Sequence, residues 1–243
     1  MSTLILPDWP MPATVKACST TRHGGISQPP YDSLNLGTHV GDIARCVANN
    51  RQYLVDQGGL PQMPVWLDQV HGTRVLHLSG QVISDVQADA VYSRVSGQVC
   101  AVMTADCLPV LFCSLAGDEV AAAHAGWRGL CAGVLGQTLM QFNAAPSSII
   151  AWLGPAIGSQ QFEVGEDVKQ AFISIDSQSA IAFTPFGSNY LADIYLLARL
   201  RLKASGIYAI YGGTRCTVSE KQQFFSYRRD GVTGRMASLV WLI

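Results

Sequence analysis

Short apolar runs alternate along the chain with glycine-rich and polar turns, a pattern that predicts a mixed α and β fold. Runs rich in β-branched and aromatic residues predict strands. They occupy Val15–Thr20, Val65–Val70, Val75–Leu78, Ala90–Ser93, Val99–Met103, Val110–Cys113, Val120–Ala123, Ile149–Leu153 and Ala237–Ile243. Several of these runs are apolar throughout, so we expect sheets that are covered on both faces.

Apolar residues at helical spacing predict helices between the later strands. These are Leu130–Phe142, Val168–Ile173 and Leu191–Leu202. On the last of them, Arg199, Arg201 and Lys203 face away from the apolar stripe, and we expect them to be solvated. The chain has no internal repeat or flexible linker, and its 243 residues suit one large domain. We therefore expect a single domain over residues 1–243.

Charged residues make up only 14% of the chain, against a usual share of about 25%. This low share excludes disordered chains, charged coiled coils and long acidic or basic tails. The formal net charge of -1 provides no overall field that would attract nucleic acid or an anionic membrane. We therefore expect a small-molecule partner, and an anionic substrate would need local arginines.

The N-terminal residues MSTLILPDWPMP carry no Lys or Arg before their short apolar run, unlike a secretory signal. The chain also lacks an unbroken run of about 20 apolar residues that could span a membrane. The seven cysteines are odd in number and scattered, so we expect reduced thiols rather than a disulfide framework. A cytoplasmic location is the expectation.

Candidate chemistry concentrates where apolar runs end. Cys107 follows one run beside Asp106, while His124 and His71 end two others and precede small residues. Taken singly, each is a common structural residue, a buried thiol or a hydrogen-bonded imidazole. Two imidazoles and one thiolate match catalytic zinc with an open fourth position, but the same set also serves blue copper. The spacing matches no short metal motif, so both metals remain open.

Several arginines lie beside glycine or in polar loops, namely Arg22, Arg128, Arg228, Arg229 and Arg235. A guanidinium suits phosphate or carboxylate oxygens, and we select Arg22, Arg128 and Arg228 as candidates for an anion pocket. Asn35 lies in a Leu-Asn-Leu-Gly turn. It either caps its own backbone, which we favour, or contacts a ribose hydroxyl. The chain has no dinucleotide, P-loop or zinc deaminase signature.

Five segments of the chain together resemble the YfiH/YlmD family. That family has been labelled laccase-like or polyphenol oxidase and later purine nucleoside phosphorylase. They are Gln69-Val70-His71-Gly72, Thr104 to Val110, Ala123 to Gly129, Gly154-Pro155-Ala156-Ile157-Gly158 and Phe225-Ser226-Tyr227-Arg228-Arg229. The similarity runs from about residue 3 to the C-terminus. It implies one α/β domain like the catalytic domain of cytotoxic necrotizing factor, with zinc held by His71, Cys107 and His124.

The resemblance implies zinc-dependent phosphorolysis of adenosine, inosine, guanosine or methylthioadenosine, with adenosine deamination as a side activity. Cys107, His124 and Asp106 would be catalytic, with Asp106 as a proton shuttle. Arg22, Arg128, Arg228 and Asn35 would bind the nucleoside and the phosphate. Hydrolysis of UDP-MurNAc-L-serine in peptidoglycan editing is an alternative that would use the same residues.

Three further hypotheses share the same side chains. Copper in place of zinc would support weak oxidation of phenols, although five histidines are too few for a multicopper cluster. A Cys107/His124 dyad would serve a thiol hydrolase, which a bound metal would suppress. A zinc ion that only staples a binding protein is the non-enzymatic alternative. It is disfavoured because a core of this size does not need a metal to fold.

Overall fold

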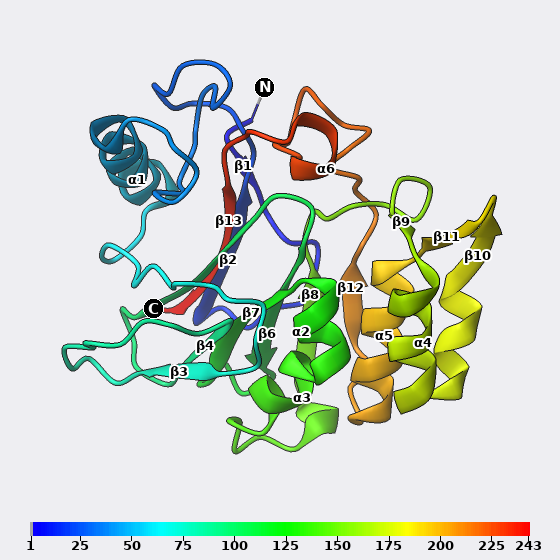
Figure 1. The fold of residues 1–243 in the computed structure, drawn as a ribbon. Coiled ribbons are helices and arrows are strands. Elements are labelled where there is room, and N and C mark those ends of the chain that lie inside the picture. The colour runs from blue at the N-terminus through cyan, green and yellow to red at the C-terminus, as the bar shows by residue number, and fades with distance from the viewer. Residues whose placement is uncertain (1) are drawn as a thin grey trace.

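The computed structural model describes residues 2–243, and two large β-sheets lie face to face at its centre (Figure 1). The first sheet has the order β1 (Leu4–Ile5), β2 (Val15–Thr20), β13 (Met236–Leu242) and β5 (Val99–Thr104). The second has the order β12 (Ile210–Gly212), β8 (Ile149–Leu153), β6 (Leu108–Ser114), β7 (Val120–Ala125), β4 (Ala90–Ser93) and β3 (Val75–Leu78). A small third sheet contains β10 (Phe183–Phe186), β11 (Asn189–Ala192) and β9 (Glu163–Val164).

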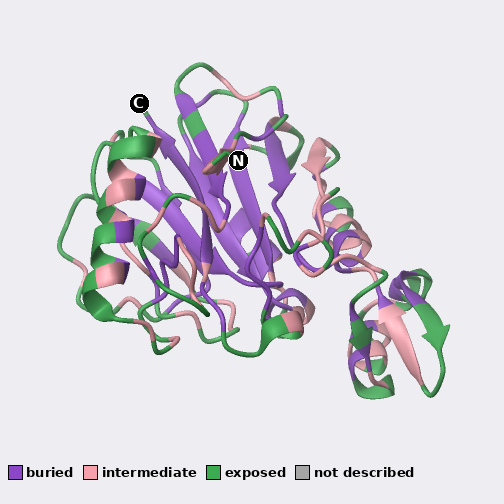
Figure 2. Ribbon diagram, turned by 90° about the horizontal axis from the view of Figure 1, so that it is seen from above, coloured by how far each residue is buried: buried purple, intermediate pink, exposed green. Residues whose placement is uncertain are grey.

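The helices within residues 2–243 are α1 (Ala44–Gly58), α2 (Trp127–Ala132), α3 (Val134–Leu139), α4 (Glu166–Ile175), α5 (Ile194–Ala204), α6 (Tyr227–Asp230) and the 3-10 helices η1 (Pro146–Ser148) and η2 (Ser177–Ala182). Residues of α1 pack on the outer face of the first sheet, and residues of α2, α3 and α5 pack on that of the second. Helix α4 packs against α2 and the small third sheet, and α6 lies beyond the upper ends of the large sheets in Figure 1. Figure 2 shows buried strands inside and exposed helix faces outside. The mixed fold with helix-covered sheets is therefore confirmed.

Each central strand contributes alternate side chains to two different cores. In β6, Leu111 and Cys113 point between the two sheets, whereas Val110 and Phe112 pack against the helices. A strand that is buried on both faces has few positions for a polar side chain. This arrangement explains why most of each central strand is apolar instead of alternating, with polar residues such as Ser114 and His124 at or near the strand ends.

Three of the predicted elements differ in the structure. The predicted strand Val65–Val70 is wrong, because this segment makes only an isolated bridge from Asp68 to Gln87. The side chain of Gln69 instead exchanges two hydrogen bonds with the backbone of Met103 (2.7 and 2.8 Å). These bonds hold the segment as a loop beside the end of β5.

The predicted helix Leu130–Phe142 is divided into α2 and α3 by Gly133, whose φ of 99° is left-handed. The predicted helix Leu191–Leu202 begins later, at Ile194, after the cap residue Asp193, whose side chain accepts a hydrogen bond from the Leu196 amide (2.9 Å). The two residues before Asp193 belong to β11. Helix α1 was not predicted.

The expected solvation of Arg199 and Arg201 is also wrong. Arg199 donates to the carbonyls of Ile210 (3.1 Å) and Gly212 (2.7 Å), because α5 packs beside the edge strand β12. Two guanidinium nitrogens of Arg201 are buried, and its guanidinium lies 5.9 Å from the centre of the Phe172 ring. All seven cysteines are free thiols, as their odd number and scatter predict. None of the helices within residues 2–243 combines the length and hydropathy that a membrane crossing requires.

A buried carboxylate fixes the turn between β6 and β7. Glu119 is 2% exposed and accepts hydrogen bonds from the Tyr92 hydroxyl and from the backbone amides of Asn143 and Ala144 (2.8 Å each). Burial alone would raise the pKa of Glu119, but these donors outweigh it and lower the pKa.

Replacing Glu119 with Gln should lower the free energy of unfolding by about 1 to 3 kcal/mol at neutral pH, because one acceptor oxygen becomes a donor that faces other donors. The folded pKa lies below the unfolded value, so the carboxylate stabilises the fold above the unfolded pKa of about 4.3. That stabilisation is lost as the pH falls through the folded pKa. Urea denaturation should show a smaller difference between variant and wild type near pH 3 than at neutral pH. Glu166→Gln, at an exposed pair with Lys169, is the control and should leave the free energy of unfolding nearly unchanged.

Candidate metal centre

Three side chains that are far apart in sequence meet where the chain passes from one large sheet to the other. Cys107 lies in the turn between β5 of the first sheet and β6 of the second. The antiparallel register pairs Pro109 with His124, which brings the end of β7 beside that turn. His71 enters from the loop before β3. The nearest ligand atoms of His71, Cys107 and His124 all lie within 4.8 Å of one another.

The backbone at this site adopts conformations that are rare for residues other than glycine. Within residues 2–243, His71 (φ 61°) and Asp106 (φ 84°) are the two non-glycine residues with positive φ. The left-handed conformation costs about 1 to 2 kcal/mol per residue, so surrounding contacts must hold it. The His71 amide donates to Asp89 (2.9 Å), and the Asp106 carbonyl accepts from the Ile157 amide (2.9 Å). Strain is thus concentrated at one candidate ligand and directly before another.

Asp89 organises two of the three candidate ligands, and it was not predicted. Its carboxylate is fully buried and accepts a hydrogen bond from His124 Nδ1 (2.8 Å). It also accepts from the backbone amides of Val70 (3.2 Å), His71 (2.9 Å) and Gly72 (2.6 Å). Burial opposes ionisation of Asp89, but the bonds from His124 and the amides lower its pKa. With Nδ1 committed to Asp89, His124 Nε2 is the nitrogen left to bind a metal.

Cys107 and His124 stabilise each other's charged forms. Burial would raise the pKa of the Cys107 thiol, but the imidazoles of His124 and His71 outweigh it and lower the pKa. Burial would likewise lower the pKa of His124, yet Cys107 and Asp89 raise it. The thiolate is the form of cysteine that binds metals and attacks electrophiles. The site therefore favours this form of Cys107.

The donor geometry fits a metal ion. Zinc bonds of about 2.0 to 2.3 Å in a tetrahedral site place the ligand atoms about 3.5 Å apart. Cys107 Sγ and His71 Nε2 are 3.8 Å apart. A Cβ atom at Gly126 would lie 2.8 Å from His71 Cδ2 and 3.0 Å from Cys107 Sγ, so glycine leaves space beside the donors. Two imidazoles and one thiolate suit zinc and copper alike.

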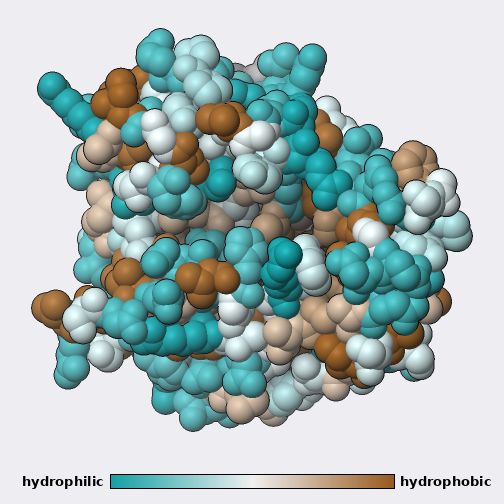
Figure 3. Space-filling view, viewed as in Figure 1, coloured by the Kyte–Doolittle hydropathy of each residue, from teal (hydrophilic) through white to brown (hydrophobic). Residues whose placement is uncertain are grey.

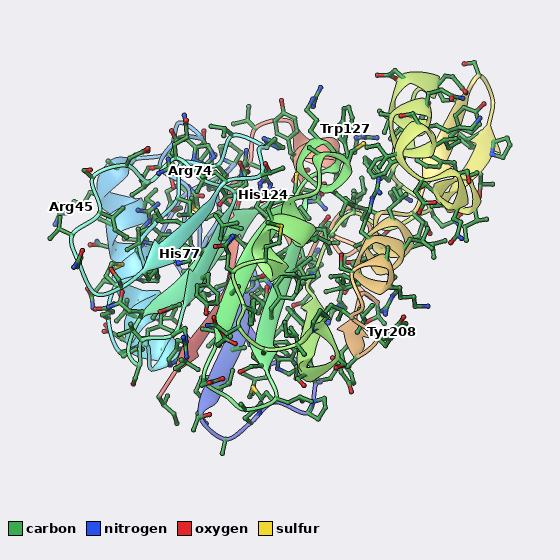
Figure 4. The ribbon with its side chains drawn as sticks, turned by 90° about the horizontal axis from the view of Figure 1, so that it is seen from below. Arg45, Arg74, His77, His124, Trp127 and Tyr208 are labelled. Carbon is green, nitrogen blue, oxygen red and sulfur yellow. The ribbon has the colours of Figure 1, made fainter. Side chains whose placement is uncertain are left out.

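Two cavities flank these donors and share Ala105, Cys107 and Tyr227 as a common wall. The first, about 380 Å³, is called the His39 lobe and is lined also by His39, Gln69, Met103, Thr104, Arg235 and the two histidine ligands. The second, about 250 Å³, is called the Trp127 lobe and is lined also by Asp106, Trp127, Arg128, Ile157, Phe162, Ile194 and Arg228. In Figure 3 a hollow crosses this face of the molecule below α6. Figure 4, seen from below, labels His124 on β7 and Trp127 at the start of α2, which follows that strand.

The three arginines selected from the sequence do not converge. Arg128 and Arg228 both line the Trp127 lobe, with their guanidinium groups 4.4 Å from the Trp127 ring centre and 5.6 Å from the Phe162 ring centre. Arg22 lies in a different surface cavity. Its guanidinium donates to the carbonyls of Asp32 (2.8 Å) and Lys221 (3.1 Å), and also pairs with the Asp32 carboxylate (3.3 Å).

Asn35 is buried, and protein groups occupy its side-chain amide. Its oxygen accepts from the backbone amides of Gly37 and Arg235 (2.9 Å each). Its nitrogen donates to the Gly37 carbonyl (3.1 Å) and to the Asp42 carboxylate (2.9 Å). This geometry matches the turn interpretation, in which Asn35 supports the backbone around Arg235.

Asp106 joins the turn at Cys107 to the C-terminal part of the chain. Its carboxylate accepts from the hydroxyls of Thr217 (2.6 Å) and Ser226 (3.1 Å) and from the backbone amide of Arg228 (2.6 Å). Three protein donors thus surround both oxygens. The structure therefore gives Asp106 a supporting contact next to Cys107.

The fold and the site together define a class: a domain of two stacked sheets between helices, with a two-histidine, one-cysteine centre where the sheets join. Residues 16–243 match the family described as multi-copper polyphenol oxidoreductase laccase. The chain belongs to this family, and the resemblance to YfiH and YlmD proteins is confirmed.

Proteins named as purine nucleoside phosphorylases match this chain over nearly their whole length. The Escherichia coli protein named purine nucleoside phosphorylase YfiH is 60% identical over 243 residues, which is 100% of both chains. A Haemophilus influenzae purine nucleoside phosphorylase is 54% identical and 98% of each chain is covered. Because these close relatives are enzymes over the full length of the chain, this protein is an enzyme as well.

Solved structures show the same fold. A Neisseria meningitidis protein has a TM-score of 0.95 and 52% identity, with 99% of each chain covered. YlmD from Geobacillus stearothermophilus has a TM-score of 0.90 and 33% identity, with coverage of 99% of this chain and 96% of that one.

The histidines of this chain do not supply a multicopper cluster. His23 bonds the Gln222 carbonyl and His77 bonds the Gln141 side chain, both away from the centre. Within residues 2–243, His71, Cys107 and His124 form the one group of three or more such ligands. A blue-copper site plus a trinuclear cluster needs more donors than these three. The donor set of this chain therefore does not match the multicopper centre that the family description implies.

Asp89→Asn should reduce the affinity for zinc on the order of 10- to 100-fold, because an amide cannot fix both His124 and the loop at His71. Competition against a chromophoric chelator measures the change, and the melting temperature reports whether the variant folds. Asp85→Asn removes an exposed partner of Arg74 and is the matched control, which should bind zinc like wild type. Unchanged affinity in a folded Asp89→Asn protein would contradict the role given to Asp89.

Proposed function

We propose that this chain is a zinc-dependent purine nucleoside phosphorylase. The observation that carries the proposal is the candidate metal centre at the meeting point of two cavities, both of which present arginine. Phosphorolysis requires two substrates to meet, a nucleoside and a phosphate anion. The names of the relatives that match the full chain support the same reaction.

The ligands proposed for zinc are His71, Cys107 and His124. When bound there, zinc would act as a Lewis acid that polarises a substrate oxygen. Asp89 keeps His124 in the ligating tautomer through the bond at Nδ1. Asp106 holds the turn that carries Cys107, and is proposed as a positioning residue rather than a proton shuttle. The side chains at the lobes bind and orient the two substrates.

In the proposed reaction a phosphate oxygen attacks the anomeric carbon of the nucleoside. The new carbon–oxygen bond forms as the glycosidic carbon–nitrogen bond breaks, and the electron pair leaves with the purine, which takes up the proton that the hydrogen phosphate gives up on becoming an ester. Guanidinium groups balance the charge of the phosphate and fix its orientation, which lowers the entropic cost of the encounter. The proposed substrates are adenosine, inosine, guanosine and methylthioadenosine, with adenosine deamination as a side activity.

Purified zinc-loaded protein should release purine base from inosine only when phosphate is present, as measured by chromatography of the products. Cys107→Ala should abolish this release and weaken zinc binding. Cys100→Ala, at a fully buried thiol in the core between the sheets, is the matched control. It should retain activity and lose on the order of 1 kcal/mol of stability.

A chelator separates the enzymatic proposal from a metal that only staples the fold. Loss of base release with an unchanged melting temperature supports catalysis, whereas collapse of the fold supports the staple. Equal activity of Cys107→Ala and wild type would contradict the proposed role of the thiol. Absence of phosphate-dependent base release in wild type would favour hydrolysis of UDP-MurNAc-L-serine at the same residues.

A further inference from the structure

Arg235 places a positive charge without an acidic partner in the His39 lobe. Its side chain is half-buried and takes part in none of the ion pairs within residues 2–243. Nη1 donates to the carbonyls of Thr233 and Gly234 (3.1 Å each), and the other two guanidinium nitrogens have no acceptor in the described chain. Burial lowers the pKa of Arg235, and the charges of Cys107 and Asp106, which form no ion pair with it, only partly offset this effect. A bound anion would compensate such a charge.

His39 faces the same space and also has no hydrogen-bond partner within residues 2–243. Burial and the nearby charge of Arg235 lower the pKa of His39; Arg51 acts in the same direction, and Asp68 acts against it. Both side chains line the same cavity, so one ligand bound there can reach both. An imidazole N–H and two guanidinium nitrogens are therefore available to one ligand.

The turn at Asn35 holds Arg235 in place. Besides the bond from the Arg235 amide to the Asn35 side chain, the Leu36 amide donates to the Arg235 carbonyl (3.1 Å). A Cβ atom at Gly37 would lie 2.8 Å from Cγ of Arg235, so this glycine makes room for the arginine side chain. The same turn leads directly into His39. One braced segment thus presents both groups to the lobe.

The Trp127 lobe has a different character. Its lining includes the rings of Trp127, Phe162 and Tyr227 together with two isoleucines, which suits the flat face of a purine. Its arginines lie over aromatic rings, and Arg228 is also tied to the Glu163 carbonyl (2.9 Å). Both arginine side chains are largely exposed to solvent. They can add cation–π contacts to a stacked base without a desolvated charge to neutralise.

We propose that His39 and Arg235 form the phosphate subsite and that the purine binds in the Trp127 lobe, with the ribose over Cys107 and Tyr227 between them. This inference rests on the proposed phosphorylase function and divides that site into two subsites. In-line displacement needs the attacking oxygen and the leaving nitrogen on opposite faces of the anomeric carbon. Two lobes that meet at one wall provide that arrangement. No oxidant or further reactant is needed.

Binding of inorganic phosphate to the zinc-loaded protein, measured by titration calorimetry, tests the subsite without turnover. Arg235→Gln should raise the phosphate Kd and the phosphate KM roughly 10- to 100-fold, since charge-assisted hydrogen bonds are lost. The inosine KM should change by less than about twofold. Arg235→Lys should fall between, because it keeps the charge and loses the fork. His39→Asn should also weaken phosphate binding, and it tests the lobe independently if Arg235→Gln folds poorly.

Phe162→Ala should produce the opposite result, a raised inosine KM with an unchanged phosphate Kd. Arg45→Gln is the matched arginine control, because Arg45 is an exposed residue of α1 and lies far from His124 in Figure 4. It should leave all constants unchanged. Zinc content and melting temperature are measured for every variant.

The subsite assignment is overturned if folded Arg235→Gln and His39→Asn bind phosphate like wild type while wild type releases base. It is reversed if Arg128→Gln or Arg228→Gln weakens phosphate binding more than Arg235→Gln does. Failure of the phosphorylase function has a separate signature, namely wild type without phosphate-dependent base release. In that case a phosphate Kd that still depends on Arg235 and His39 would support the anion subsite alone. A wild-type protein that binds no phosphate would overturn the inference.

Discussion

The candidate centre depends on the carboxylate of Asp89, which is fully buried and accepts four hydrogen bonds. One of them fixes the His124 ring on β7, and the other three hold the loop in which His71 has a left-handed backbone. A buried carboxylate is costly unless its oxygens are satisfied, and here the satisfaction itself orients two ligands. The Asp89 carboxylate therefore links the buried strand β7 to the loop at His71 and, through the same hydrogen bonds, orients both histidines.

The remaining ligand is placed by topology. Cys107 lies in the turn that leaves β5 of the first sheet and enters β6 of the second, so its position follows from how the two sheets stack. Asp106 takes a left-handed conformation there and binds three donors from the C-terminal part of the chain. The contacts that hold this turn thus come from segments more than 100 residues away.

The sequence could predict most of the strands and single out the three candidate ligands that the fold brings together, because both leave local signals, namely apolar runs and the polar residues that end them. It placed Arg22 with the other arginines, but only the fold shows that the Asp32 and Lys221 carbonyls occupy its donors in another cavity. Asp89 was missed although a carboxylate between two alanines, directly before the predicted strand Ala90–Ser93, is a usable signal. The pairing of His39 with Arg235 joins segments nearly 200 residues apart, and no local pattern encodes it.

The two cavities take most of their lining residues from different parts of the fold. The His39 lobe takes residues from β5 and from just before β13 of the first sheet and from the turn before α1, and it also contacts His124 on β7 of the second sheet. The Trp127 lobe is built from α2, α5 and the segment before β9, on the side of the second. Because Cys107 lies on the connection between the sheets, it belongs to both lobes. A site at such a connection can hold two ligands on either side of one reacting atom, with both sheets and the segments between them fixing the side chains that contact the ligands.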